Sequence, residues 1–537
     1  MKLKKEFLIK IFKQNPYWVI FGLFCVLITS YFMALSADYI RVTTNHIQFY
    51  GINGLWIPIF MACLARVIHY ITKYGLAVTS RHLGFKLRTQ LRVSLLDRWL
   101  HIPYASYEKK QVGQYISIAQ NDVENAQYYM YVVFSRIGMS FFNVLMAIPF
   151  MIRIDLGLTI MVLTVSIVFG IINQRILKKI KHNESHARLT QEKITNISLS
   201  GYNSADSVKI YAAADYMQNL YLKVRLLYSK ALMNIVQIEG ARESFYTIVN
   251  NATLYGSIIF LGYRTIIGIN TLGDTISFNI LLTQALVAIG MIFRWTGQMV
   301  RCNASWERLE QQFITPLPQK KVSSQGVDIK KVNINNFSFD YDDGVQIFSN
   351  MAMEFEKGKI YCISGASGSG KTTLIKCLLG LYRTEKGQYY VNDKEVDQDQ
   401  VADLISYVPS EHYLFQGTVC DNVSLGNNDV SKESCFKIAD MLGVGNWLRN
   451  LPGGLDYVIE TDGLNLSGGQ RQSLCILRAL LWRRPILVFD EPFSALDHEK
   501  EKMLKDALLE IKRNHIILIT SHREQTLDIC DGFFRLN

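Results

Sequence analysis

The sequence lacks any close pairing of its cysteines. Nine cysteines are spread over 537 residues, and no two of them have C-x-x-C spacing. A zinc site or a small disulfide framework is recognised by such paired or regular spacing. The cysteines are therefore expected to be buried or reduced thiols in a cytosolic context.

The N-terminus also lacks a signal-peptide cleavage site, because no small-residue motif follows the first apolar stretch. Residues Met1–Pro16 are basic and alternate Lys with Phe, Leu and Ile, which predicts an uncleaved interfacial helix leading into a membrane span. Acidic residues are fewer than basic ones, 46 against 57, giving a net charge of +11. Lys and Arg accumulate in the cytoplasmic loops of membrane proteins, so no nucleic-acid partner is expected.

Long apolar stretches are confined to the N-terminal part of the chain. Crossing a bilayer as a helix takes about 20 mostly apolar residues. Six stretches come close: Tyr17–Ser36, Gly54–Tyr74, Tyr129–Ile152, Leu156–Ile176, Phe245–Ile267 and Ile276–Met299. Long segments rich in Lys and Arg follow the second and fourth, and short loops follow the first, third and fifth. The positive-inside rule therefore places both long segments and both termini in the cytoplasm.

The two long segments are expected to continue the spans as helical arms. In the first, Leu87, Leu91, Leu95, Leu96 and Leu100 recur at helical spacing.

Four basic side chains fall within the expected spans: Arg66, His69, Arg136 and Arg294. One interpretation is that they face a basic cavity that binds an anionic or carboxylate-bearing substrate, because charges facing lipid are costly. The other is that the span boundaries are off by a turn and these groups lie at the cytoplasmic interface. The sequence leaves both open.

The polar segment after Phe313 reads as a linker, so the predicted domains are 1–313 (membrane), 314–328 (linker) and 329–537 (soluble). The soluble part alternates short β-type runs with helical ones. The expected strands are Val332–Phe339, Lys359–Ser364, Ser406–Val408, Pro485–Phe489 and Ile516–Thr520. This alternation predicts an α/β domain with a mainly parallel, doubly wound sheet.

A phosphate-binding loop follows the second of these strands. Its residues are Gly365, Ala366, Ser367, Gly368, Ser369, Gly370, Lys371 and Thr372, which fit the pattern G-x-x-x-x-G-K-[ST]. Glycines let backbone N–H groups point at phosphate oxygens, and the following helix start, with Thr373, adds positive potential. Lys371 is expected to reach the β- and γ-phosphates and the Thr372 hydroxyl to bind magnesium.

Two acidic residues end a later strand. Asp490 closes the apolar run from Ile486, and Glu491 follows at once. An acid at the C-terminal end of such a strand lies where nucleotide sites form in open α/β sheets. We expect Asp490 to bind magnesium and Glu491 to polarise the attacking water.

A second anion cradle starts another helix at Ser467, Gly468, Gly469 and Gln470. With Leu466 before it, this segment resembles the signature sequence of the ABC ATPases, and the six-span outline resembles the ABC exporter membrane domain. In that family ATP lies between the phosphate-binding loop of one ATPase domain and the signature of another. The resemblance therefore implies ATP and Mg²⁺ as cofactors and a second copy, or a related half-transporter, as partner.

The resemblance also implies roles for single residues. Tyr341 matches the aromatic residue that stacks on adenine, His522 the histidine that contacts the γ-phosphate, and Ser494–Asp497 the loop joining the two sites. Ser410 stands where the family normally has a glutamine that helps to bind magnesium, which puts metal affinity or coupling in doubt.

The resemblance thus implies an ATP-hydrolysing exporter in the inner (cytoplasmic) membrane, with its ATPase domain in the cytoplasm. The expected substrate is amphipathic: a small or modified peptide, or else a lipid or drug. The alternative is a nucleotide-gated regulatory or sensor protein with weak ATPase activity, which the substitution at Ser410 would suit.

Overall fold

The computed structural model describes residues 2–52, 54–104, 112–314, 329–341, 346–366, 368–384, 386–493, 498–521 and 528–536. They divide into two compact units. The first lies within Met1–Leu100 and Lys110–Pro316, and the second within His101–Lys109 and Leu317–Asn537. The expected linker falls almost entirely outside the described residues.

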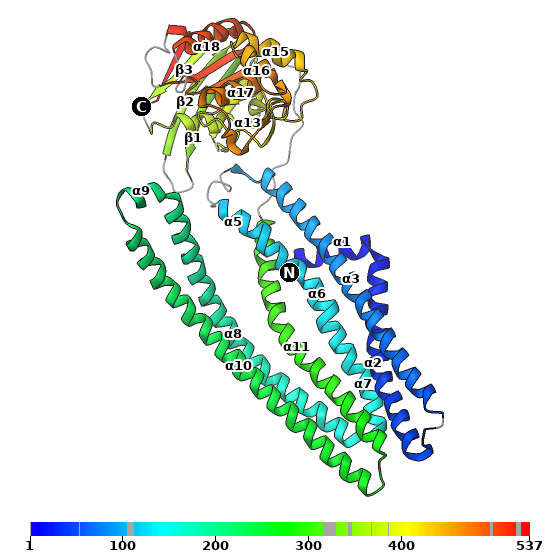
Figure 1. The fold of residues 1–537 in the computed structure, drawn as a ribbon. Helices are drawn as coiled ribbons and strands as arrows, with labels where there is room; N and C mark the ends of the chain where they lie inside the picture. The colour runs from blue at the N-terminus through cyan, green and yellow to red at the C-terminus, as the bar shows by residue number, and fades with distance from the viewer. Residues whose placement is uncertain are drawn as a thin grey trace. The chain divides into compact units, whose positions relative to one another are not determined.

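The described part of the first unit is helical (Figure 1). Its α-helices are α1 (Lys2–Gln14), α2 (Pro16–Tyr50), α3 (Trp56–His101), α5 (Val112–Ser117), α6 (Val123–Tyr131), α7 (Met139–Ile154), α8 (Leu156–Asn203), α9 (Ala205–Ile210), α10 (Ala214–Ile266) and α11 (Leu272–Gln312). Two π-helical segments, Ile118–Asp122 and Val132–Gly138, join α5, α6 and α7, so the expected third span is a helix with a wider turn inside it.

Four helical runs among the described residues are long and apolar enough to cross a membrane: Pro16–Tyr50, Tyr115–Ile154, Leu156–Ile180 and Leu272–Gln312. The expected second and fifth spans lie on α3 and α10, which are long helices. Charged residues divide their apolar stretches, such as Arg66 and Lys73 on α3 and Arg264 on α10. For these two helices, membrane crossing stays a prediction.

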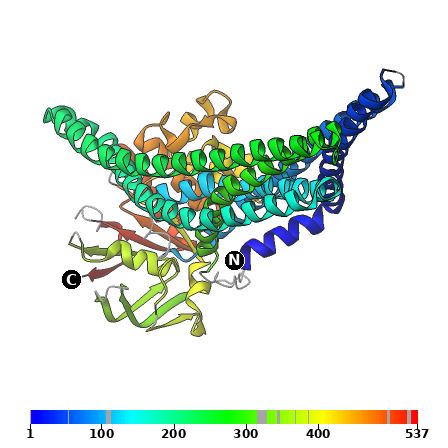
Figure 2. The ribbon, with the colours of Figure 1, turned by 90° about the horizontal axis from the view of Figure 1, so that it is seen from below.

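The arms are helical, as expected. Helices α3 and α8 contain 46 and 48 residues. At 1.5 Å per residue each is about 70 Å long, more than twice the ~30 Å thickness of a bilayer's hydrocarbon core. Helix α10 runs beside α8 along most of its length in both views (Figures 1 and 2).

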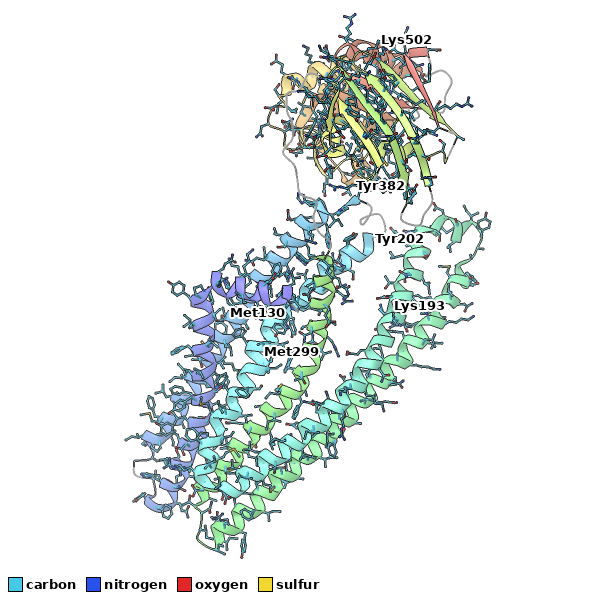
Figure 3. The ribbon with its side chains drawn as sticks, turned by 180° about the vertical axis from the view of Figure 1, so that it is seen from behind. Met130, Lys193, Tyr202, Met299, Tyr382 and Lys502 are labelled. Carbon is cyan, nitrogen blue, oxygen red and sulfur yellow. The ribbon has the colours of Figure 1, made fainter. Side chains whose placement is uncertain are left out.

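A leucine stripe on α3 builds the core near one end of the first unit. Leu87, Leu91 and Leu95 are fully buried, together with Ile11 of α1 and Met130 of α6, which is labelled in Figure 3. All five leucines lie on one helix, as their spacing predicts, and these three form its buried stripe. Leu96 and Leu100 are 57% and 73% exposed, because they lie on the opposite face of the same helix.

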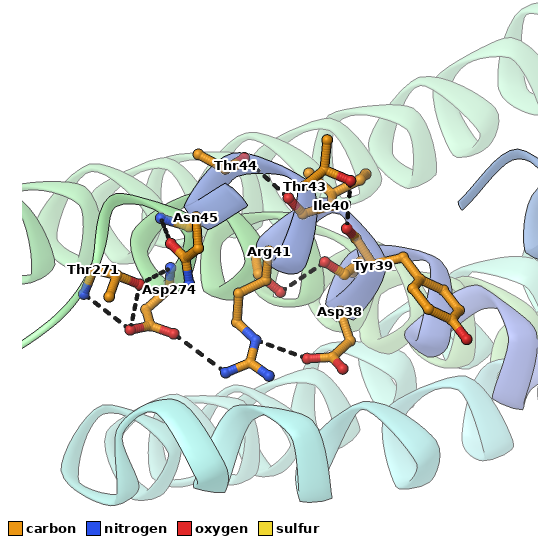
Figure 4. Close-up of polar contacts among 12 residues, drawn as sticks. Asp38, Tyr39, Ile40, Arg41, Thr43, Thr44, Asn45, Thr271 and Asp274 are labelled. Carbon is orange, nitrogen blue, oxygen red and sulfur yellow. Dashed lines mark hydrogen bonds and ion pairs between the residues drawn. The ribbon is translucent and has the colours of Figure 1, made fainter. Parts of the chain in front are cut away.

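The start of α11 is tied to α2 by polar contacts (Figure 4). Arg41 forms ion pairs with Asp38 at 2.8 Å and Asp274 at 3.5 Å. Asp274 also completes a capping box with Thr271, and Asn45 accepts a hydrogen bond from the Gly273 N–H at 3.0 Å. The helix start is thus capped both by its own side chains and by those of α2.

The second unit contains two main sheets. A parallel sheet has the order β11-β3-β10-β9-β6, and its strands are β3 (Ile360–Gly365), β6 (Ile405–Val408), β9 (Ile486–Asp490), β10 (Ile516–Thr520) and β11 (Gly532–Leu536). An antiparallel sheet has the order β2-β1-β4-β5, from β1 (Lys331–Asp340), β2 (Gln346–Glu356), β4 (Lys386–Val391) and β5 (Lys394–Val396). A short ribbon pairs β7 (Gly417–Thr418) with β8 (Val458–Ile459).

All five expected strands are present within about a residue of their predicted bounds. The first of them, β1, belongs to the antiparallel sheet and not to the parallel one. Only five residues lie between the end of β1 and the start of β2, so the chain returns antiparallel. A parallel pair needs a longer crossover.

The helices of this unit cover and flank the parallel sheet. They are α12 (Lys371–Leu378), α13 (Gln398–Ala402), α14 (Val419–Ser424), α15 (Lys432–Met441), α16 (Gly445–Asn450), α17 (Gly468–Leu481) and α18 (His498–Ile511). Strands β9 and β10 are buried at every position, and their apolar side chains contribute to two adjoining cores. This buried sheet fixes the position of the loops at its C-terminal edge.

Candidate functional site

The phosphate-binding loop joins β3 to α12. Gly368 and Gly370 have φ angles of +83° and +91°, which side-chain-bearing residues rarely adopt. A Cβ on Gly370 would also lie 2.7 Å from Cγ2 of Ile347. Both glycines are therefore needed for the shape of the loop.

Lys371 points back along this loop. Its side chain is only 8% exposed, and Nζ donates to the carbonyl oxygens of Gly365 at 2.8 Å and Ala366 at 2.9 Å. The ammonium group thus lies against the backbone that would surround a phosphate. Thr372 and Thr373 follow in the first turn of α12, where backbone N–H groups lack helical partners.

Tyr341 lies beside the same helix. Its hydroxyl is 3.0 Å from Oγ1 of Thr373, and its ring packs edge-on against Phe339 and Tyr382 with centroids 5.2 and 5.6 Å away. The half-buried ring is therefore held near the loop, where the resemblance expects an adenine-stacking residue.

Asp490 and Glu491 lie at the same edge of the sheet, at the end of β9. The Asp490 side chain is buried and accepts hydrogen bonds from Thr520 Oγ1 at 2.6 Å and from the Tyr407 hydroxyl at 3.3 Å. Burial and the neighbouring Asp490 carboxylate raise the pKa of Tyr407, so the phenol keeps its proton and donates. The Glu491 N–H donates to Thr520 Oγ1 at 3.0 Å, in a backbone with φ of +49°.

Neither Thr520 nor Tyr407 was predicted from the sequence. A signal was present for Thr520, since it ends the apolar run Ile516–Ile519 with a hydroxyl where an aliphatic residue would continue the pattern.

The order of the parallel strands brings two of the predicted groups together. Strands β3 and β9 both pair with β10, so the loop after β3 and the acids after β9 flank the end of β10. Crevices at the carboxyl ends of parallel strands are where ligands bind in open α/β sheets. One edge thus carries a phosphate loop, a lysine and two acids.

The signature residues lie elsewhere, at the start of α17. Ser467 caps this helix: Oγ accepts from the Gln470 N–H at 3.3 Å, and the Gln470 side chain accepts from the Ser467 N–H at 2.8 Å. Gly468 and Gly469 are the first two residues of this helix. Arg471 donates to the Leu466 carbonyl at 2.8 Å and so holds the preceding turn.

Ser410 follows β6 and is exposed. Three expected elements lie outside the described residues: Ser367 of the phosphate loop, the loop Ser494–Asp497, and His522. Their positions stay predictions.

The residues at the sheet edge fit a magnesium ion bound together with nucleotide. Mg²⁺ prefers oxygen ligands and is usually held by one or two carboxylates, with substrate phosphates and water completing its shell. Asp490 supplies a carboxylate already oriented by two hydroxyl donors, and Thr372 supplies a hydroxyl. No cluster of three His, Cys, Asp or Glu side chains that could hold a metal occurs among the described residues.

The first unit contains a cavity of about 320 Å³. It is lined by Phe169 and Asn173 of α8, by Arg242, Glu243, Tyr246, Thr247, Asn250, Asn251 and Leu254 of α10, and by Thr283, Leu286, Val287, Gly290, Met291, Phe293 and Arg294 of α11. One side is aromatic, with the Phe169 ring 4.6 Å from that of Tyr246 and 5.1 Å from that of Phe293.

Polar groups occupy the rest of this cavity. Arg294 pairs with Glu243 at 2.5 Å, and Arg242 adds a second positive charge. The Asn173 side chain is buried, and among the residues that the structure describes its Oδ1 has no hydrogen-bond partner. Arg242 and Glu243 were missed in the sequence because they precede the expected fifth span, although two adjacent charges directly before an apolar run are a visible signal.

Among the described residues, the four basic residues of the expected spans have different surroundings, and a shared substrate cavity for them stays a prediction. Only Arg294 lines the cavity described above, and Arg66 lines a separate, mostly apolar groove between α2 and α3. His69 is buried with Nδ1 2.9 Å from the Thr29 carbonyl, and Arg136 lies over the rings of Tyr131 and Trp295.

Comparisons with known proteins agree with both units. A family model described as the ABC transporter transmembrane region matches residues 12–289, and one described as ABC transporter matches residues 348–494. A probable ABC transporter ATP-binding/permease protein of Haemophilus influenzae is 24% identical over 91% of this chain and 88% of its own length.

Two further relatives are named for what they move. A putative multidrug export ATP-binding/permease protein of Staphylococcus aureus is 28% identical over 89% of this chain and 83% of its own length. The alpha-hemolysin translocation ATP-binding protein of Escherichia coli O157:H7 is 26% identical over 94% of this chain and 71% of its own length. A solved structure of a bacterial Atm1-family exporter with ATP bound shares the fold, with a TM-score of 0.86 at 19% identity, covering 97% of this chain and 94% of its own.

Proposed function

Because this chain belongs to the ABC transporter family, whose ATPase domain drives transport, we propose that it is a half-transporter that exports an amphipathic substrate. It works as a pair with a second copy of itself or with a related chain. It resides in the inner (cytoplasmic) membrane, with its ATPase unit in the cytoplasm. Relatives named for multidrug export and for hemolysin translocation support the outward direction.

Pairing is supported by the separate positions of the two anion cradles. The phosphate loop before α12 and the signature before α17 begin two different helices of one ATPase unit. In a pair, the loop of one chain and Ser467–Gln470 of the other would enclose the same nucleotide. ATP would then hold the two ATPase units together, because two half-sites share one polyanion.

Hydrolysis is assigned to the residues at the sheet edge. The backbone of the loop and Lys371 bind the phosphates, and Tyr341 supports the base. Glu491 orients water and accepts its proton, and Lys371 with His522 stabilises charge on the transferred phosphoryl group. Thr372 and Asp490 would hold magnesium, which neutralises phosphate charge when bound. Ser410 is a weaker candidate ligand, since it is exposed on its loop.

The substrate is assigned to the cavity between α8, α10 and α11. An aromatic side and a side with two arginines, one glutamate and several amides suit a ligand with an apolar part and a carboxylate. A small or modified peptide has this chemistry, and so do some lipids and drugs. Arg242 is the charged group that would bind the carboxylate, because Arg294 is already paired with Glu243.

The test is ATPase activity of the purified chain in lipid nanodiscs, with and without candidate peptides and lipids. We expect Mg²⁺-dependent hydrolysis that one ligand class stimulates. We also expect Arg242→Ala to lose about ten- to a hundredfold in apparent affinity for a carboxylate-bearing ligand, because a hydrogen bond to a charged group contributes about 1.5–3 kcal/mol. Arg225→Ala is the control, because Arg225 lies on the same helix outside the cavity. ATP binding without hydrolysis would contradict the proposal and favour a nucleotide-gated regulator.

A further inference from the structure

Thr520 is a polar residue in a strand that is otherwise aliphatic and completely buried. The other members of β10 are Ile516, Ile517, Leu518 and Ile519, and the exposed fraction of Thr520 is 0%. Valine has the same branched shape and would continue the pattern. A buried hydroxyl is unfavourable unless it forms hydrogen bonds, so its presence has to be explained by its partners.

Those partners are the two acidic residues at the end of β9. Thr520 is in register with Asp490 across the parallel pair, and its hydroxyl donates to Asp490 Oδ1 at 2.6 Å. The same oxygen accepts from the Glu491 N–H at 3.0 Å. A single hydroxyl thus fixes both the carboxylate of Asp490 and the backbone of Glu491, whose φ of +49° is unfavourable for a non-glycine residue.

The other oxygen of Asp490 is held from the opposite side. Tyr407 lies on β6, the other neighbour of β9, and its hydroxyl donates to Asp490 Oδ2 at 3.3 Å. The terminal torsion of an aspartate is otherwise broad, so two donors from two strands select one orientation. A carboxylate has about four lone-pair sites, and these two bonds leave others for a metal ion.

We propose that Thr520 and Tyr407 are positioning residues that orient Asp490 toward the metal of a metal–nucleotide complex, and that Thr520 also sets the position of Glu491. This inference rests on the ATP-hydrolysing function proposed above. Groups that orient metal ligands act on metal affinity through the ligand they hold. A purely structural hydrogen bond would instead affect folding stability and leave the metal dependence unchanged.

The two residues have separable effects. Of the two acidic residues, the Tyr407 hydroxyl bonds to Asp490 and not to Glu491, so its loss is expected to weaken metal binding without displacing Glu491. Thr520 contacts Asp490 and Glu491, so its loss weakens metal binding and also displaces Glu491. The turnover at saturating Mg²⁺ therefore falls more in Thr520→Val than in Tyr407→Phe.

The experiment uses the full-length chain in nanodiscs and titrates Mg²⁺ at a fixed concentration of a fluorescent ATP analogue. Thr520→Val is expected to need about tenfold more Mg²⁺ for half-maximal nucleotide binding, the low end of what removal of such a partner costs. Tyr407→Phe gives a smaller shift, because its hydrogen bond is longer. With Mn²⁺ in place of Mg²⁺, both variants change the electron paramagnetic resonance spectrum of the bound metal.

Two variants serve as controls. Thr520→Ser keeps the hydroxyl and restores the Mg²⁺ dependence of the wild type. Tyr389→Phe removes a buried phenol of the antiparallel sheet, which bonds to Thr384 at 2.7 Å, and leaves Mg²⁺ dependence unchanged. Thermal unfolding confirms that each variant is folded.

The readouts separate two failures. A folded Thr520→Val protein with the Mg²⁺ dependence of the wild type, or a Thr520→Ser protein as impaired as Thr520→Val, overturns the positioning role. Nucleotide binding by the wild type without hydrolysis overturns the proposed function, while the Mg²⁺ titration and the Mn²⁺ spectrum still test the positioning role.

Discussion

Replacing Glu491 by glutamine removes the carboxylate from the end of β9 and keeps the rest of the site. Glutamine has the same length and shape as glutamate. The backbone at position 491 therefore keeps its φ of +49°, and its N–H keeps the hydrogen bond to Thr520 Oγ1 at 3.0 Å. The phosphate loop and Asp490 are untouched. What is lost is the carboxylate that accepts a proton from the attacking water. Removal of a general base typically lowers a rate by about 10²- to 10⁴-fold, which corresponds to roughly 3–5 kcal/mol in the barrier.

The assay for Glu491→Gln is phosphate release by the full chain in nanodiscs, together with equilibrium binding of a fluorescent ATP analogue. Hydrolysis should fall by the factor given above, whereas nucleotide affinity should change little. Glu510→Gln is the matched control, because Glu510 is an exposed glutamate on α18. Turnover within a few-fold of the wild type would refute the assignment of Glu491 as the base.

Two further predictions concern other parts of the chain. In Gly290→Ala, the new Cβ would lie 2.6 Å from the ring of Tyr246, so the ring must shift. Overpacking of this kind costs about 1–3 kcal/mol and should lower the midpoint of thermal unfolding. The stimulation of ATPase activity by ligand should fall more than the basal ATPase activity. Unchanged stimulation would argue against the cavity as the substrate site. Burial and then Arg471 lower the pKa of His412, so the folded chain binds a proton here less readily than the unfolded chain, whose histidine has its ordinary pKa near 6.5. The stability contributed by neutral His412 is present above that pH and is lost as the pH falls. The midpoint of thermal unfolding should therefore fall less between pH 7 and pH 5 in His412→Gln than in the wild type. An equal fall in both proteins would contradict this.

Sequence patterns were sufficient wherever the information is local. The phosphate loop, the strands before Gly365 and after Pro485, and the capped start of α17 are written in consecutive residues, because glycine conformation, strand burial and helix capping depend on near neighbours. The leucine stripe of α3 was predictable for the same reason. Resemblance to the family then supplied the expectation of a partner chain and of the cofactors.

Contacts between segments distant in sequence were decided only by the tertiary structure. The strand order placed β6 and β10 on the two sides of β9, and so brought Tyr407 and Thr520 to the Asp490 carboxylate across separations of 83 and 30 residues. Helix packing likewise put Arg242 and Arg294 at one cavity and directed His69 to the Thr29 carbonyl. Residue type and spacing determine which groups a helix or strand offers, whereas the rotation of that element and its neighbours in the fold determine what each group contacts.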